Sequence, residues 1–201
     1  MRQYSIVGAL VFLGALTLFL WIEVLQAQEF RVTFFDIGQG DAIYIETTEG
    51  HRILVDGGPD VAILEKLGEQ IPFWDRKIDL VVLTHPDADH LGGLIDVLER
   101  YEVEHILWTG VETNTKLFQE WLMKMEEEEA EITVVDALQK IAWNSSVYIE
   151  VLHPIKDYET KVLNDTSVVL RVIHPEAAIL LTGDATEAVE KELTVTADVL
   201  K

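Results

Sequence analysis

The feature that most constrains the fold is a cluster of ionisable side chains directly after an apolar strand. Residues 78–84 are mostly apolar, which is typical of a buried strand. His85, Asp87, Asp89 and His90 then follow within six positions. Carboxylates this close together repel one another unless a cation offsets their charge. The sequence therefore predicts a site for one or two metal ions at the end of this strand.

Ordinary turn chemistry is the alternative interpretation of this cluster. A threonine or an aspartate can cap the helix that follows, and Gly92-Gly93 would give a flexible turn. Capping accounts for one acid, but it leaves the second acid and both histidines unexplained. We therefore predict metal binding.

Composition limits both the partners and the chemistry of the site. The length of 201 residues suggests one domain of ordinary size, and the 49% of hydrophobic residues suffices for a core. The absence of cysteine excludes disulfides and thiolate metal ligands. Lys and Arg total 15 against 36 Asp and Glu, so the formal net charge is −21. Such a surface attracts cations and repels nucleic acid, so a DNA-binding role requires a local patch or bound metal ions.

The N-terminal segment has a different composition from the rest. Residues 6–22 carry no charge. The length of this run is close to the roughly 20 apolar residues that a membrane-spanning helix needs. Arg2 precedes this run and favours a cytoplasmic N-terminus with an exported domain. A cleaved signal peptide is the alternative, but its apolar region is usually only about 7–15 residues long. We expect a single-pass membrane anchor over residues 1–27 and an extracytoplasmic domain over residues 28–201.

Hydrophobic periodicity predicts a mixed α/β domain. Strands are expected at 30–34, 41–46, 52–56, 78–84, 105–108, 132–135, 146–152, 167–173 and 178–181, and helices at 61–67, 94–101, 115–130 and 186–193. Strands and helices alternate in the first half, and strands dominate the second. This order predicts sheets with helices packed on the outside.

Several separated motifs resemble those of metallo-β-lactamase-fold hydrolases, and more narrowly the hydrolase domain of ComEC-type DNA-uptake proteins. In chain order they are Phe35-Asp36-Ile37-Gly38-Gln39-Gly40-Asp41, Leu54-Val55-Asp56-Gly57-Gly58, Thr84-His85-Pro86-Asp87-Ala88-Asp89-His90, Asn164-Asp165-Thr166-Ser167-Val168-Val169-Leu170 and Leu180-Leu181-Thr182-Gly183-Asp184. The resemblance implies a four-layer αββα sandwich with a metal site at one edge of the two sheets. A membrane channel usually accompanies this domain in the family, so a single candidate helix implies a stand-alone anchored relative.

The resemblance also implies the metal ligands. His85 and Asp87 would hold one divalent metal ion, Asp89 and His90 would hold a second, and Asp184 would bridge the two. Asp87 stands where many members of the superfamily have histidine. A carboxylate in place of that imidazole shifts the metal preference of the site from Zn²⁺ toward Mn²⁺, without excluding Zn²⁺.

The remaining site residues are assigned roles around this pair of ions. Two metal ions lower the pKa of a bridging water toward about 7, and Asp89 would be the catalytic residue that orients this water and accepts its proton. Asp41 and Asp56 would hold the ligands through hydrogen bonds, with ordinary turn chemistry as the alternative. Asn164 and Asp165 would supply a further ligand or a substrate contact.

The last residues of the sequence resemble a segment that other family members continue. In the family, a segment like residues 197–201 runs on into a motif with paired histidines that supplies another metal ligand, whereas this sequence ends at Lys201. We therefore expect an αββα sandwich that lacks its final portion and binds metal more weakly. Its exposed sheet edge would invite a missing C-terminal segment or a partner chain.

Two functional hypotheses follow. The first is a membrane-anchored, metal-dependent hydrolase of phosphodiesters, nuclease-like, with DNA at the cell surface as its substrate. The second is a truncated, non-catalytic domain that binds metal or a partner chain. Because fold does not fix the substrate, thioesterase and lactonase activities are also compatible with the motifs.

Overall fold

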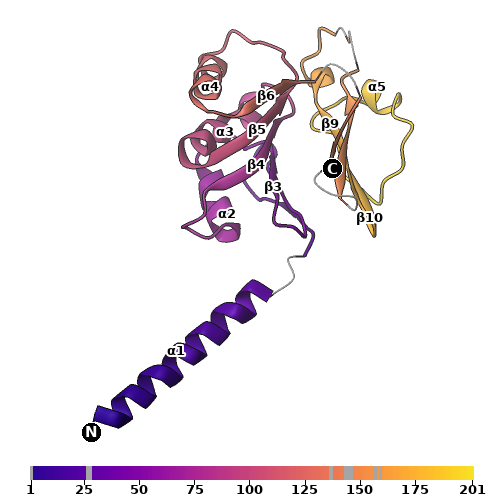
Figure 1. Cartoon of the computed structure of the whole chain (residues 1–201). Coiled ribbons are helices and arrows are strands. Elements are labelled where there is room, and N and C mark those ends of the chain that lie inside the picture. Colours follow the sequence, from indigo (N-terminus) through magenta and orange to yellow (C-terminus); the bar gives the residue numbers. More distant parts are fainter. Residues whose placement is uncertain (1, 26–28, 136–137, 143–146, 156–157, 159) are drawn as a thin grey trace.

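The structure of this chain is a computed structural model, which describes residues 2–25, 29–135, 138–142, 147–155, 158 and 160–201. Two β-sheets face each other, and helices cover the outer side of the first sheet (Figure 1). A separate N-terminal helix precedes the sheets (Figure 1). The mixed α/β architecture expected from the sequence is therefore confirmed.

The first sheet has six strands in chain order. They are β1 (Arg31–Phe34), β2 (Ile43–Glu46), β3 (Arg52–Val55), β4 (Lys77–Leu83), β5 (Glu102–Trp108) and β6 (Glu131–Val134). The first three pair antiparallel, and β3 to β6 pair parallel. All residues of β4 except Lys77 are buried, as expected for a parallel strand that is covered on both faces.

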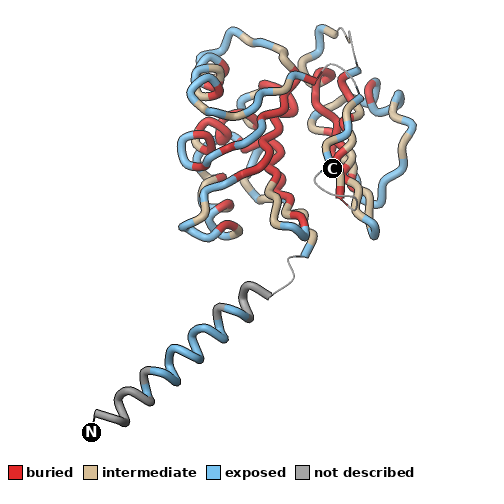
Figure 2. The backbone as a smooth tube through the Cα atoms, viewed as in Figure 1, coloured by how far each residue is buried: buried red, intermediate tan, exposed pale blue. Residues whose placement is uncertain are grey.

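Three amphipathic helices cover the outer face of this sheet, namely α2 (Ala62–Gln70), α3 (Ala88–Arg100) and α4 (Lys116–Glu127). Their apolar faces form one core with the sheet, in which Leu83 of β4 packs with Leu91 and Leu94 of α3. Figure 2 shows this buried layer in red between the helices and the strands. The Thr115 side chain caps α4 by accepting a hydrogen bond from the Phe118 amide.

The second sheet has five strands, in the order β11-β10-β9-β8-β7. They are β7 (Gln139–Ala142), β8 (Tyr148–His153), β9 (Val169–His174), β10 (Ala177–Leu181) and β11 (Val199–Leu200). A second apolar core lies between the two sheets and includes Val55 and Val82 from the first and Leu170 and Leu181 from the second. The short elements η1 (Asn164–Thr166) and α5 (Glu187–Glu190) flank the strands.

The structure corrects the expected position of the helix after β4. The sequence predicts a turn followed by a helix at residues 94–101, but α3 already begins at Ala88. The carbonyl of Asp87 accepts hydrogen bonds from the amides of His90 and Leu91, so the helix ladder starts inside the predicted turn. Asp89 and His90 therefore lie in the first turn of a helix, which fixes their directions.

Two strands were not predicted. The strand β7 alternates intermediate and exposed positions at the edge of its sheet, and β11 has only two residues, both exposed. Neither has the apolar pattern of a buried strand. Among the residues that the structure describes, the second sheet has only one α-helix on its outer side, the four-residue α5 (Figure 1).

The N-terminal helix α1 (Arg2–Leu25) exposes large apolar side chains that include Leu10, Phe12, Leu18 and Trp21. Within the described part of the chain, no helix is long and apolar enough to cross a membrane. The single-pass transmembrane anchor expected over residues 1–27 is therefore not supported. The expected boundary between residues 27 and 28 lies outside the described residues.

Candidate metal centre

The carboxyl end of β4 and the start of α3 place two histidines side by side. His85 follows β4 by two positions, and His90 lies in the first turn of α3. Both are almost completely buried, at 0% and 1% exposure, and their ring centroids are 4.2 Å apart. The local motif thus brings two imidazoles together beneath the surface.

The second sheet contributes Asp184, which follows β10. Gly183 has a φ of +53°, and a Cβ atom at this position would lie 3.1 Å from the Thr84 side chain. This close approach brings the Asp184 carboxylate 3.6 Å from Nε2 of His90. His85, His90 and Asp184 each offer one potential ligand atom, and these three atoms lie within 4.8 Å of one another. A site is therefore formed where the two sheets meet.

Asp56 organises the buried side of this site. It follows β3 with a φ of +59° and is 1% exposed. Its carboxylate accepts hydrogen bonds from the Thr84 amide at 2.8 Å and the Thr84 hydroxyl at 2.7 Å. The same carboxylate lies 2.8 Å from Nδ1 of His90. One buried acid therefore fixes both the end of β4 and one histidine ring.

The hydrogen bonds determine which histidine nitrogens are free. The single hydroxyl proton of Thr84 goes to Asp56, so the Thr84 oxygen can only accept from Nδ1–H of His85, which is 3.0 Å away. Nδ1–H of His90 likewise donates to Asp56. In the neutral form, both rings then present an unprotonated Nε2 on the side of Asp184. Such partners are typical of histidines that bind metal.

The two histidines have opposite shifts in pKa. Burial, together with the neighbouring His90, lowers the pKa of His85. Burial also opposes the charged form of His90, but the hydrogen bond and charge of Asp56, with the charges of Asp184 and Asp41, raise the pKa of His90 to about 9. The carboxylates that favour a proton on His90 also favour a divalent cation at the same place.

Two observations test whether a metal ion fits the residues present. Nε2 of His85 is buried and has no hydrogen-bond partner among the described residues, although Oδ2 of Asp87 lies 3.4 Å away. Asp87 is the N-cap residue of α3, yet its side chain makes no capping hydrogen bond. The capping alternative therefore does not account for Asp87. Two imidazole nitrogens with nearby carboxylate oxygens suit Zn²⁺, Mn²⁺ or a similar ion.

Asp89 has a different partner. Its carboxylate accepts a hydrogen bond from Nε2 of Gln39 at 3.1 Å. Gly40 has a φ of +85°, and a Cβ atom there would lie 1.8 Å from the Asp89 carbonyl oxygen. The loop between β1 and β2 therefore packs directly against the first turn of α3. Nothing in the described contacts brings the Asp89 carboxylate to the atoms of His85, His90 and Asp184.

Asp41 forms an ion pair that links the two sheets. The Lys201 ammonium lies 2.5 Å from Oδ1 of Asp41. The backbone carbonyl of Lys201 also accepts hydrogen bonds from the amide and hydroxyl of Thr182, two residues before Asp184. Lys201 thus connects the strand that leads to Asp184 with the β1–β2 loop beside α3.

Asn164 and Asp165 lie in η1, next to the segment that follows Asp184. The Asp165 carboxylate accepts a hydrogen bond from the Thr186 hydroxyl at 2.6 Å, and its carbonyl lies 2.8 Å from Nε2 of His153. The Asn164 carbonyl accepts from Ser167. These contacts hold the segment in place, and the proposed ligand or substrate role of both residues stays a prediction.

The structure therefore brings part of the predicted site together. His85, His90 and Asp184 converge, Asp87 lies beside His85, and Asp56 holds His90. The metal-ligand roles, the pair of ions and the catalytic role of Asp89 stay predictions. Sequence reasoning missed the Thr84 hydroxyl, the Gln39 amide and the Lys201 ammonium. Thr84 could have been found, because it directly precedes the histidine motif on a strand that ends there.

The chain matches one known family and two curated relatives over most of its length. Residues 35–200 match the family model of the metallo-beta-lactamase superfamily. ComE operon protein 3 of Bacillus subtilis is 28% identical over 208 residues, which cover 90% of this chain and 26% of that protein. Competence protein ComA of Neisseria gonorrhoeae is 30% identical over 173 residues, covering 85% of this chain and 22% of that protein. The chain spans about a quarter of the length of these relatives.

Solved structures show the same fold at low sequence identity. The metallo-beta-lactamase fold protein YhfI from Bacillus subtilis has a TM-score of 0.51 and 19% identity, covering 80% of this chain and 62% of that one. CmlA, a diiron beta-hydroxylase from Streptomyces venezuelae, has a TM-score of 0.53 and 17% identity, covering 86% of this chain and 34% of that one. At this identity the likeness concerns the fold alone.

Proposed function

Because the chain belongs to the metallo-β-lactamase superfamily, we propose that it is a metal-dependent hydrolase that cleaves phosphodiester bonds. The convergence of His85, His90 and Asp184 at the junction of the two sheets carries this proposal. These residues come from separate motifs, and burial leaves a nitrogen of His85 without a partner among the described residues. A divalent ion bound there would polarise a phosphoryl oxygen, which makes the phosphorus easier to attack, and would lower the pKa of a bound water.

The protein contributes the orientation of these groups. Nε2 of His85, Nε2 of His90 and Oδ1 of Asp184 would hold the ion, with Asp87 beside His85. Asp56 keeps the His90 ring in one tautomer, and Thr84 does the same for His85. Asp89, held by Gln39, would accept a proton from the attacking water. As the P–O bond to the leaving group breaks, Asp89 would give this proton to the leaving oxygen, which restores the Asp89 carboxylate.

Two considerations favour a phosphodiester as substrate. The motifs resemble those of ComEC-type DNA-uptake proteins, and one relative is named ComE operon protein 3 and another Competence protein ComA. The carboxylates of Asp87 and Asp184 would also favour a hard divalent ion, and such an ion binds the oxygen atoms of a phosphate well. With a net charge of −21, the chain must neutralise a polyanion locally, and the metal centre is the place to do so.

Metal binding and turnover test the proposal together. The full chain is freed of metal with a chelator and titrated with Mn²⁺ or Zn²⁺. Hydrolysis of bis(p-nitrophenyl) phosphate and of a single-stranded oligonucleotide is then followed. We expect metal-dependent hydrolysis, which Asp89→Asn lowers by about 10²–10⁴-fold, the usual contribution of a general base.

A matched pair of histidine variants supplies the control. His85→Gln should abolish both metal binding and turnover, whereas His105→Gln should retain both, because His105 lies in β5 with its side chain 48% exposed. Metal binding without any turnover of either substrate would contradict the proposal. That result would favour a non-catalytic domain that binds metal or a partner chain.

A further inference from the structure

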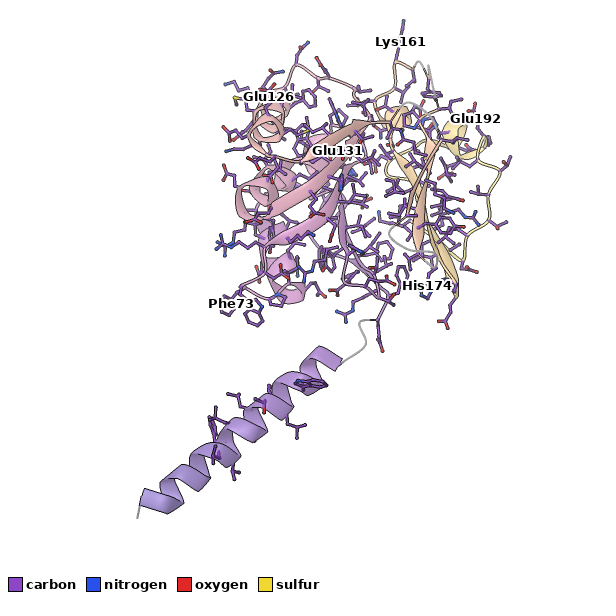
Figure 3. All side chains as sticks on the ribbon, in the orientation of Figure 1. Phe73, Glu126, Glu131, Lys161, His174 and Glu192 are labelled. Carbon is purple, nitrogen blue, oxygen red and sulfur yellow. The ribbon has the colours of Figure 1, made fainter. Side chains whose placement is uncertain are left out.

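An exposed aromatic pair lies at the edge of the first sheet opposite the candidate metal centre. Phe73 and Trp74 precede the first residue of β4, whereas His85 follows the last. Their side chains are 82% and 74% exposed, and their rings meet edge to face at 4.9 Å between centroids. Figure 3 labels Phe73 at the rim of the molecule. Large aromatic rings exposed to this extent are unfavourable in water and point to a contact surface.

Two arginines without acidic partners lie beside this pair. Arg76 and Arg100 line the same pocket of about 110 Å³ as Phe73. Asp75 also lines it, but its carboxylate is paired with Arg52 at 2.7 Å. Neither guanidinium forms an ion pair with any residue that the structure describes, whereas Arg52 and Lys77 nearby are paired with acids. On a chain with a net charge of −21, two unpaired cations together form a local exception. The pocket therefore suits an anionic group beside an apolar one.

The chain also enters the domain at this edge. The strand β1 is antiparallel to β2, which is antiparallel to β3, and β3 is parallel to β4. The first residue of β1, Arg31, therefore lies at the same edge as the first residue of β4. A hydrogen bond of 3.3 Å from Arg31 to Gln70, at the end of α2, agrees with this placement. The residues before Arg31 include the exposed apolar side chains of α1.

We propose that Phe73, Trp74, Arg76 and Arg100 form a docking surface for an anionic lipid bilayer, which we call the Phe73 patch. Aromatic rings are favoured at the boundary between headgroups and acyl chains, where one side is apolar and the other is wet. Arginines beside them pair with lipid phosphates. The patch lies apart from the metal centre, so this proposal does not rest on hydrolase activity.

Charge distinguishes a bilayer from a nucleic acid. Aromatic and arginine side chains also stack on the bases of single strands. A long polyanion bound at the patch would however have to run along the acidic faces of the domain, which repel it. A bilayer that rests on the aromatic pair needs only the two arginines beside it, although the same edge continues into an acidic surface with Glu102, Glu104 and Glu131. A strand bound here would also present no phosphodiester to the metal centre at the opposite edge.

The absence of cysteine from the sequence allows a site-specific test on the full chain. Phe73→Cys is labelled with an environment-sensitive fluorophore such as NBD and mixed with vesicles of phosphatidylcholine alone or with phosphatidylglycerol. We expect a blue shift and a several-fold rise in emission with the anionic vesicles. Met123→Cys, which is on α4 and 57% exposed, is the matched control and should show no change.

Removing the cations tests the electrostatic part of the surface. Arg76→Gln with Arg100→Gln should weaken the response to anionic vesicles by about 30-fold, as expected for two basic residues near an anionic surface. Equal responses of the two labelled sites, or no response at position 73, would overturn the proposal. A response to a single-stranded oligonucleotide but not to vesicles would assign the patch to nucleic acid and would overturn it as well. Soluble glycerophosphoglycerol should give no shift, because it lacks a bilayer.

Discussion

The two halves of the candidate metal centre differ in how firmly they are held. His85 and His90, on the first sheet and α3, are almost completely buried and share hydrogen bonds with Thr84 and Asp56. The Asp184 side chain, on the second sheet, is 45% exposed and depends on contacts between the sheets. The histidine half is therefore built within the first sheet, by the ends of β3 and β4 and the first turn of α3. The aspartate half is correctly placed only when the two sheets are docked.

The largest effect is expected from breaking the histidine half. Asp56→Ala should lower the free energy of unfolding of the metal-free chain by about 3–5 kcal/mol, because it leaves a buried, charged His90 without its partner. Asp184→Ala should change it by less than about 0.5 kcal/mol, because its carboxylate is exposed. Urea unfolding at pH 7 measures both. Equal losses for the two variants would contradict the difference between the halves.

A second buried aspartate separates global stability from the metal centre. Asp79, near the other end of β4, accepts a hydrogen bond from the Arg52 amide at 2.8 Å and lies 3.3 Å from the Lys77 ammonium. Burial alone would raise the pKa of Asp79, but the Arg52 amide, His51 and Lys77 together lower it. Its stabilisation is therefore present above the unfolded pKa of about 3.9 and is lost as the pH falls through the lower folded pKa.

We expect Asp79→Asn to cost about 1–3 kcal/mol of unfolding free energy at pH 7. The difference in unfolding free energy between the variant and the parent chain should become smaller as the pH falls below about 4. Metal affinity at pH 7 should be unchanged by the substitution. Unfolding curves across this pH range provide the measurement, and a gap that widens in acid would show the sign to be wrong.

The link between the halves gives a smaller effect. Lys201→Met removes the ion pair with Asp41 that joins the β10–β11 edge to the β1–β2 loop. We expect metal affinity to fall by about tenfold, the lower end of the range for groups that hold ligands in place. Lys191→Met is the matched control, because its pair with Glu187 at 2.7 Å is exposed and joins the first residue of α5 to its C-cap. Calorimetric titration with Mn²⁺ should separate the two variants, and equal affinities would exclude the link.

The smallest effect comes from two threonine caps. Thr115→Ala on α4 and Thr186→Ala on α5 should each cost about 1 kcal/mol, because each removes a side-chain acceptor at a helix start. Only Thr186→Ala should also weaken metal binding, since it lies two residues after Asp184 and donates to Asp165. Thermal melting and metal titration of both variants test this. Weaker metal binding by Thr115→Ala would contradict the expected difference between the two caps.

Sequence and structure agree best where the information is local. The strand that ends near His85, and the closeness of His85, Asp87 and His90, follow from one short motif with an apolar run before it. The helix start at Ala88 was missed because the acids there looked like a turn, whereas backbone amides bond to the Asp87 carbonyl. The strand β7 was missed because it is a partly exposed edge strand without apolar alternation.

The contacts that sequence reasoning could not supply are those between distant residues. Gln39 and Asp89 are 50 positions apart, and Asp41 and Lys201 are 160 apart. Nothing in the pattern of either segment indicates its partner, because such pairs are fixed by the docking of loops and sheets. The resemblance to known motifs placed Asp41 and Asp89 near the site, but it did not reveal which side chains hold them.

The length of β4 has a consequence for how a substrate would arrive. The strand has seven residues, and at about 3.3 Å per residue it measures roughly 23 Å from the end near Phe73 to the end near His85. If the edge with Phe73 rests on lipid, this span sets the height at which His85 stands above the headgroups. A flexible polymer in the aqueous phase could reach that height from above, whereas a phosphate group within the bilayer could not.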